Sequence, residues 1–325
     1  MKVYAALLKR EWLEHRGAFI WSPLVVFALI VVFGITMVGG QGSFEVELTS
    51  GDSSSSLKAF VDGNGESEDT YQANRIGRLL AGFFLDVAAA TDEELSDRMG
   101  VLTRFTAAPF HLVLFVVSLF GLIACLHDER KDKSVYFWKS LPVGDFTTVM
   151  SKFAFFAWVA PLVTIAAILA AQLFVTFLIV GMVEDGMGSR VLIHSGLVMG
   201  LVQMLVGYLL NGLVVLPVFA WFILISGWAK TLPMVWALAI PFSLVVFEGI
   251  VWDTGIVRSF IGYHTSMPTL PATTVGGDET AYAIVVTTLA DQFAVLGQGR
   301  FWFGLLIGFL FFTPAVYLRR MRNEI

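Results

Sequence analysis

Six long apolar stretches alternate with polar segments along the chain. They cover residues 19–38, 107–126, 153–183, 194–226, 234–252 and 301–318. A hydrocarbon core about 30 Å thick is crossed by ~20 helical residues, so each stretch is long enough to span a bilayer. The third and fourth stretches are longer than this core and must tilt, kink or extend into the headgroups. The pattern predicts an all-α integral membrane protein with six transmembrane helices.

Every one of the six stretches contains one proline. Pro23 and Pro109 fall in the first turns of the predicted spans, where a missing backbone N–H is tolerated. The other four lie deeper, where proline frees a carbonyl or kinks the helix. These four are Pro161, Pro217, Pro241 and Pro314. We therefore expect kinks in the later spans, a common feature of membrane helices.

The first 18 residues have the pattern of an amphipathic helix. Apolar side chains gather on one face, and the charged ones are expected around the other: Lys9, Arg10, Glu11, Glu14 and Arg16. Such a helix is typical of an element that lies in the membrane surface. No A-x-A cleavage site follows it, so we expect the first apolar stretch to be retained as a span.

Composition and charge sorting extend this picture. The chain of 325 residues is 57% hydrophobic, with a mean hydropathy of +0.77, which is typical of membrane proteins. With the amino terminus inside, the cytoplasmic segments hold 13 Lys and Arg against 7 Asp and Glu, and the outer segments hold 8 against 18. Because basic residues favour the cytoplasmic side, both termini are predicted to be cytoplasmic.

Two long segments are then predicted to lie on the outer side. Residues 39–106 begin with a Gly, Ser and Asp-rich run that is typical of flexible chain, and they become helical in pattern beyond Tyr71. A second short helix is expected from Thr91, because Thr91 and Glu94 have the spacing of a capping box. Residues 253–300 hold two moderately apolar pieces around a polar centre, which favours a re-entrant or interfacial helical hairpin over an ordinary loop.

Motifs of the common enzyme classes are absent from the sequence. It contains no G-x-x-x-x-G-K-[ST], H-E-x-x-H or G-x-S-x-G, and its one cysteine, Cys125, excludes an intrachain disulfide. The five histidines are far apart in sequence and predict no metal site: His15, His111, His127, His194 and His264. We expect no catalytic residue, cofactor or metal in this chain.

Polar residues inside the spans are candidates for a pathway. Glu248 is the one acid well inside an apolar stretch, where it either contacts a proton or cation or bonds a neighbouring helix. Gln203 and Asn211 either line a path or join helices. The pairs Gly196/Gly200 and Gly304/Gly308 have a spacing that allows close helix packing.

The segment 127–152 is the long charged loop between two spans. It begins with alternating charges, followed by four apolar or amphipathic residues that are costly to leave in water: Val135, Tyr136, Phe137 and Trp138. Pro142 and Gly144 end any preceding helix, and Asp145 is expected to cap the next one. We predict a short cytoplasmic helix with charges on one side and aromatics on the other, the alternative being an interfacial aromatic belt.

The architecture, together with the loop wording DERKDKSVYFWKSLPVGD, resembles the permease subunits of bacterial ABC-2 type transporters. The resemblance implies that residues 127–152 form a coupling helix that docks into a separate ATPase, which binds ATP and Mg²⁺. It implies polar docking contacts from Asp128, Glu129, Arg130, Lys131, Asp132 and Lys139, and a buried anchor of Val135, Tyr136, Phe137 and Trp138. Residues 227–233 would be a minor second contact.

The same resemblance implies a bacterial cytoplasmic membrane and a second, identical or related permease. The expected activity is ATP-driven export. Because the spans are apolar, an amphiphilic substrate is favoured. The outer segment 39–106 is larger than in compact members of this family. The alternatives are a membrane-embedded enzyme or an ATP-independent carrier that uses Glu248.

Overall fold

The computed structural model describes residues 2–39, 44–47, 56–59, 90–183, 186–265, 272–275, 282–285 and 289–321. The described chain is dominated by helices. Six of them are long and apolar enough to cross a membrane: Val3–Ile35, Asp92–Lys131, Asp145–Gly181, Gly188–Val214, Pro233–Val251 and Gly299–Met321. The prediction of a helical chain with six segments long and apolar enough to span a membrane is confirmed for these residues. The fourth segment differs in position, because it covers Gly188–Val214 where residues 194–226 were predicted.

Helices α1 (Lys2–Gly39) and α3 (Asp92–Lys131) both begin well before their apolar stretches. The amphipathic segment and the first span are therefore one continuous helix, and the location of residues 1–18 in the membrane surface stays a prediction. Pro23 and Pro109 lie inside these helices, so their expected first-turn positions are wrong.

The start of α3 at Thr91 is confirmed. The Thr91 hydroxyl accepts from the Glu94 N–H at 3.3 Å, and the Glu94 carboxylate accepts from the Thr91 N–H at 2.9 Å. The two bonds satisfy N–H groups that the first turn of any helix leaves free. The helix that starts here is not short, because it runs through the second span to Lys131.

The third and fourth stretches are interrupted at their prolines. Between α5 (Asp145–Ala154) and α6 (Ala160–Met182) lies a π turn, Phe155–Val159, closed by the Ala160 N–H donating to the Phe155 carbonyl. Pro161 follows directly and cannot donate a backbone bond, which favours this altered register. The fourth stretch follows α7 (Gly188–His194) and is divided at Val215 into α8 (Leu197–Val214) and α9 (Leu216–Trp228), with Pro217 in the first turn of α9.

The remaining elements are α4 (Ser134–Lys139), α10 (Pro233–Val251), α11 (Ile256–Thr265), α12 (Leu289–Ala294), a 3₁₀ turn (Val295–Gly297) and α13 (Gly299–Met321). Two antiparallel hairpins pair β1 (Phe44–Glu47) with β2 (Ser56–Ala59) and β3 (Ala272–Val275) with β4 (Tyr282–Val285).

These hairpins differ from the predictions for the two outer segments. A hairpin lies where the Gly, Ser and Asp-rich run predicted flexible chain. The last outer segment contains helices α11 and α12, but residues 282–285 form a strand where the second half of a helical hairpin was predicted. Whether this segment is re-entrant stays a prediction. The helical face predicted beyond Tyr71 lies outside the described residues.

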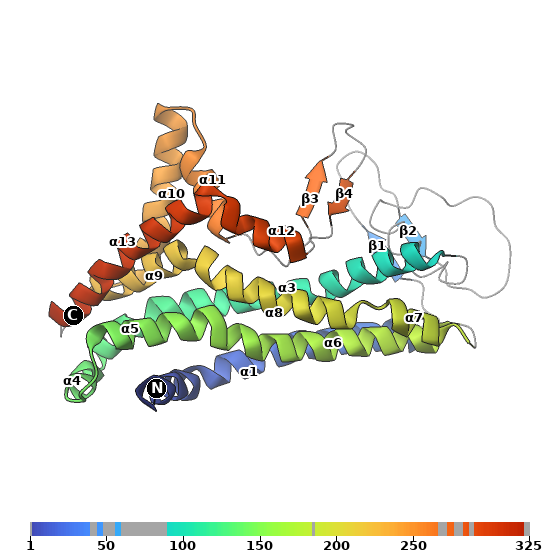
Figure 1. Cartoon of the computed structure of the whole chain (residues 1–325), viewed down its shortest axis with the longest axis horizontal. Coiled ribbons are helices and arrows are strands. Elements are labelled where there is room, and N and C mark those ends of the chain that lie inside the picture. The colour runs from blue at the N-terminus through green and yellow to red at the C-terminus, as the bar shows by residue number, and fades with distance from the viewer. Residues whose placement is uncertain are drawn as a thin grey trace.

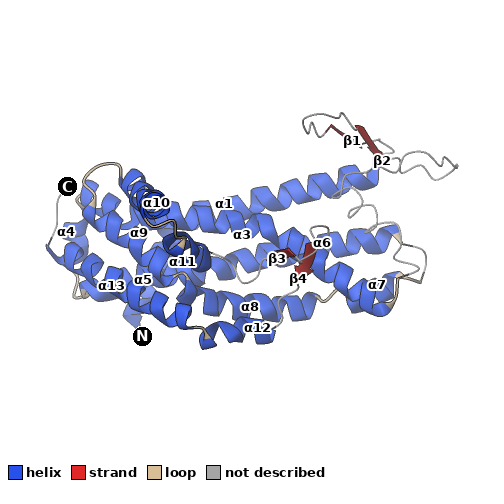
Figure 2. Cartoon of the chain, turned by 90° about the horizontal axis from the view of Figure 1, so that it is seen from above, coloured by secondary structure: helices blue, strands red, loops and turns tan. Residues whose placement is uncertain are grey.

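Helices α1, α3, α6 and α8 lie side by side in a long bundle (Figures 1 and 2). Aromatic side chains fill its core: Phe156 packs against Gly121 so closely that a Cβ on this glycine would overlap the ring. Helix α13 packs along α9, while α10 and α11 project from the bundle across its long direction (Figure 1). We call this projecting pair, residues 233–265, the α10–α11 arm.

Candidate functional site

The predicted short helix in segment 127–152 is α4, which lies at one end of the bundle (Figure 1). Helix α3 ends at Lys131, and Lys133 adopts the left-handed backbone conformation, φ 58°, that turns the chain into α4. Helix α4 ends at Lys139, and α5 begins at Asp145 after the turn that contains Pro142 and Gly144. The turn residues thus separate α4 from α5 as predicted.

The two faces of α4 differ in exposure. Tyr136 and Phe137 are 45% and 61% exposed, whereas Val135 is buried. Trp138 is covered by Arg10 of α1, whose guanidinium carbon lies 3.6 Å from the ring centroid. The Lys139 ammonium donates to the Arg320 carbonyl of α13 at 2.9 Å. The inner face therefore attaches α4 to the bundle, and the outer face presents two aromatic side chains.

The charged residues before α4 are also divided into exposed and buried ones. Asp128, Lys131, Asp132 and Lys133 are exposed, whereas Glu129 and Arg130 are buried in the last turn of α3. Arg130 donates to the Ser226 and Ala229 carbonyls at the end of α9, at 2.7 and 2.9 Å. The expectation that Glu129, Arg130 and Val135 face a partner is wrong, because helix packing within the chain covers them.

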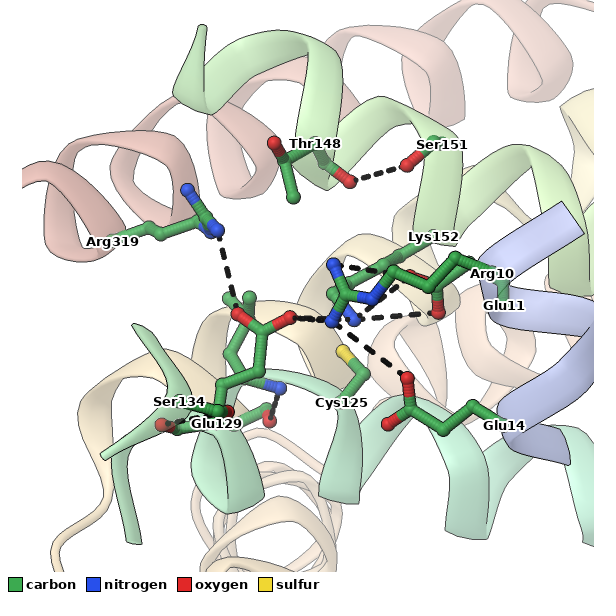
Figure 3. A network of polar contacts seen from close by, with 12 residues as sticks. Arg10, Glu11, Glu14, Cys125, Glu129, Ser134, Thr148, Ser151, Lys152 and Arg319 are labelled. Atoms are coloured by element: carbon green, nitrogen blue, oxygen red, sulfur yellow. Dashed lines mark hydrogen bonds and ion pairs between the residues drawn. The ribbon is translucent and has the colours of Figure 1, made fainter. Parts of the chain in front are cut away.

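Glu129 is the centre of a buried ion cluster (Figure 3). Its Oε1 lies 2.5 Å from Arg10 Nη2 of α1 and 3.1 Å from Lys152 Nζ of α5. Its Oε2 lies 3.4 Å from Arg319 Nη2 of α13. One carboxylate on α3 therefore binds cations from three other helices.

Two further acids complete the cluster. Lys152 Nζ lies 3.1 Å from Oε1 of Glu11, and both side chains are fully buried. Arg319 also forms an ion pair with Asp145. Three cations and three anions therefore neutralise one another, which offsets the large cost of removing each charge from water. We call these residues, Arg10, Glu11, Glu129, Asp145, Lys152 and Arg319, the base cluster.

Two predictions about residues of this cluster are wrong. Glu11 is expected on the charged face of α1, yet it points into the bundle one turn after the buried Leu7. Asp145 does not cap α5, because the cap residue is Gly144 and makes no side-chain bond, while the Asp145 carboxylate pairs with Arg319. Sequence reasoning missed four residues of the cluster as site residues: Arg10, Glu11, Lys152 and Arg319. For Glu11, its position one turn after Leu7 on the helical wheel was a usable signal.

A group with metal-binding geometry lies at the edge of the base cluster. Ligand atoms of Glu11, Glu14 and His15 are within 4.8 Å of one another. Lys152 Nζ, however, lies 3.1 and 3.3 Å from the two Glu11 oxygens. Because this ammonium group already supplies a positive charge to Glu11, the arrangement is better described as an ion pair than as a metal centre.

The candidate pathway residues have different roles in the structure. Gln203 Oε1 accepts from Arg104 Nη2 of α3 at 3.2 Å. Asn211 is buried on the same helix, α8, and its Oδ1 has no hydrogen-bond partner among the described residues. Glu248 belongs to α10 of the arm, which projects away from α8 (Figure 1). The three are not brought together, and a pathway along them stays a prediction.

Glu248 caps helix α11. Its Oε1 accepts from the Thr254 hydroxyl at 2.7 Å and from the Ile256 N–H at 2.6 Å, and its Oε2 accepts from the Val257 N–H at 2.8 Å. The carboxylate thus satisfies N–H groups of the first turn and lies at the positive end of the helix dipole. Of the two readings left open for Glu248, the contacts favour bonding to a neighbouring helix.

The arm is held against α13 by close glycine packing. A Cβ on Gly304 would overlap the His264 ring of α11, and a Cβ on Gly308 would lie 2.6 Å from Leu216 of α9. His264 Nδ1 lies 2.6 Å from the Val214 carbonyl at the end of α8. Burial lowers the pKa of His264 below its ordinary value, which favours the neutral imidazole.

The other glycine pair does not pack in this way. Gly196 precedes α8 with a positive φ of 64°. Among the described residues, no atom lies within 4 Å of the place that a methyl group would take on Gly196 or on Gly200. Close packing is thus confirmed for Gly304/Gly308 and wrong for Gly196/Gly200.

Comparison with known proteins gives no match: no family model matches the chain, and no curated protein sequence and no solved structure is significantly similar to it. A functional conclusion therefore depends on α4, on the base cluster and on the sequence of the charged loop.

Proposed function

We propose that the chain is the permease subunit of an ABC exporter of the ABC-2 type, with α4 as the helix that docks onto a separate ATPase subunit. The observation that carries the proposal is the two-sided character of α4. Its inner face is attached to the bundle, and its outer face presents Tyr136 and Phe137 to the surroundings.

The exposed surface has the composition of a docking site. Large aromatic side chains are enriched at the centres of protein interfaces, where a few of them supply most of the binding energy. Exposed charges of both signs directly precede α4 in the chain, from Asp128, Lys131, Asp132 and Lys133. Such a surface fits an apolar slot with a charged rim on the partner, which would bind ATP and Mg²⁺ because this chain has no phosphate-binding loop.

The attachment of α4 supports a mechanical role. Val135 is buried, Trp138 lies under Arg10 of α1, and Lys139 bonds the last turn of α13. A force on α4 would therefore reach α1 and α13 as well as the adjoining α3 and α5. In an exporter, this is the route by which ATP binding to the partner would move the spans.

The wider proposal follows from the sequence. It places the chain in a bacterial cytoplasmic membrane with both termini inside, together with a second, identical or related permease. The substrate is proposed to be amphiphilic, since the spans are apolar. The enzyme and carrier alternatives depend on Glu248, and the engagement of both its oxygens in capping α11 weakens their support.

Capture of an ATPase subunit tests the proposal. The full chain is co-expressed with a candidate ABC ATPase, reconstituted in nanodiscs and pulled down, for the native protein and for Phe137→Ala. Phe303→Ala is the matched control, because Phe303 is 55% exposed but lies at the opposite end of α13 from the base cluster.

We expect the native chain and Phe303→Ala to retain the ATPase, and Phe137→Ala to bind it at least about tenfold more weakly, as for an interface hot spot. Failure of the native chain to capture any ABC ATPase would overturn the proposal. Equal binding by the native chain and Phe137→Ala would remove α4 as the docking helix.

A further inference from the structure

We infer that α13 links the end of the bundle that carries α4 and the base cluster, called the docking end below, to the α10–α11 arm. We further infer that Arg319 is the residue that fixes the position of α13 at the docking end. The linkage is a property of this chain alone. Its use, the transfer of motion from a docked ATPase to the outer part of the permease, rests on the proposed function.

The last turn of α13 contacts three other elements at the docking end. Arg319 pairs with Glu129 of α3 at 3.4 Å and with Asp145 of α5. The carbonyl of the next residue, Arg320, accepts from Lys139 of α4 at 2.9 Å. Because Arg319 is buried and bonded to both α3 and α5, the docking loop and this end of α13 must move together or break an ion pair.

The other half of α13 contacts the arm and the break between α8 and α9. At Gly304 the His264 ring of α11 lies against the α13 backbone, and at Gly308 the Leu216 side chain does so. His264 in turn bonds the Val214 carbonyl beside the break. Contacts this close leave no room for α13 to slide without displacing α11 or the start of α9.

A single continuous helix joins these two ends. Arg319 and Gly304 are 15 residues apart on α13, about 22 Å at 1.5 Å per residue. Pro314 lies between them inside the helix, but α13 also packs along α9 over much of its length, which supports it laterally. Movement of Arg319 is therefore expected to shift α13 at Gly304 and so to affect His264, although Arg319 and His264 are not in contact.

Hydrogen exchange on the full chain in nanodiscs, without any ATPase, tests the linkage. We compare Arg319→Gln with Arg320→Gln, since the adjacent Arg320 side chain is exposed and its contact with Lys139 uses the backbone. Arg319→Gln is expected to change exchange in α4 and α5, as any loss of the local ion pairs would. The linkage predicts in addition at least about threefold faster exchange in α11, with Arg320→Gln unchanged there.

The result that overturns the linkage is a change confined to α4 and α5. If Arg319→Gln fails to fold, Asp145→Asn is the second variant, because it removes one partner of Arg319 and leaves the pair with Glu129. It is expected to speed α11 exchange in the same direction, and native exchange in α11 would overturn the linkage. If the chain shows the linkage yet captures no ATPase, the proposed function is refuted and the linkage within the chain stands.

Discussion

Two buried glutamates, Glu129 and Glu248, show opposite ways of keeping a carboxylate inside this protein. Glu129 binds Arg10, Lys152 and Arg319, which are contributed by three other helices. Glu248 binds a hydroxyl and two N–H groups that lie six to nine residues along the chain. The carboxylate of Glu129 finds its partners only when four helices meet. The carboxylate of Glu248 finds its partners in the turn and helix that directly follow α10.

This difference separates the two ends of the molecule. At the base cluster, movement of any one helix leaves an unpaired charge in a buried site, which is costly. At the arm, the carboxylate of Glu248 in α10 caps α11, so this cap does not depend on how the arm contacts the bundle. The docking end is thus expected to behave as one connected body, and the arm as the part that responds.

The largest expected effect is the loss of charge at the centre of the base cluster. Glu129→Gln leaves Lys152 and the cluster arginines buried without their shared counter-charge, so we expect a loss of about 3–5 kcal/mol in the free energy of unfolding. Unfolding in mixed detergent micelles measures it. Glu14→Gln is the control, because Glu14 is more exposed and touches the cluster only through Arg10 at 3.7 Å. Equal costs for the two variants would show that the cluster does not hold the bundle together.

A double-mutant cycle sharpens this result. Lys152→Met leaves Glu11 buried with Arg10 and His15 as its nearest basic groups among the described residues, each at 3.9 Å. Adding Glu11→Leu removes the stranded carboxylate, so the double variant is expected to be more stable than the sum of the single changes by on the order of 1 kcal/mol or more. Simple additivity would mean that the two side chains do not interact as the 3.1 Å distance indicates.

The spans could be predicted from sequence because length and apolarity are local properties. The start of α3 at Thr91 was predictable for the same reason, since both partners of the capping box lie within four residues. The base cluster was not, because its partners are 119, 141 and 190 residues apart along the chain. No local pattern encodes such pairings.

The misplacement of Glu129 has a specific cause. Alternating acids and bases are typical of a solvated surface, so the run from Asp128 to Lys133 predicts one exposed face. Helix α3 in fact continues past Leu126, and Glu129 falls one turn after the buried Cys125 and two turns after Leu122. Extending the helical period by one more turn would have placed Glu129 inside, but not identified its partners.

A smaller effect is expected where the arm meets α13. Gly304→Ala puts a methyl group into the space of the His264 ring, so it should cost about 1–3 kcal/mol through overpacking. Gly262→Ala on the same arm is the control, because no atom of the described residues lies within 4 Å of its added methyl. That change should be neutral or stabilise by up to about 1 kcal/mol, since alanine favours helix. Equal behaviour of the two variants would show that α11 and α13 are not in close contact.

The smallest global effect is expected at Glu248. Glu248→Gln keeps one side-chain oxygen that can accept from the first turn of α11, so the cap is weakened rather than lost. Unfolding of the whole protein should be nearly unchanged, while hydrogen exchange at Ile256 and Val257 becomes faster. A global loss comparable to that of Glu129→Gln would erase the contrast between the two carboxylates. Because α11 also contacts α13 through His264, faster exchange should stop at the first turn of α11 and spare the residues around His264.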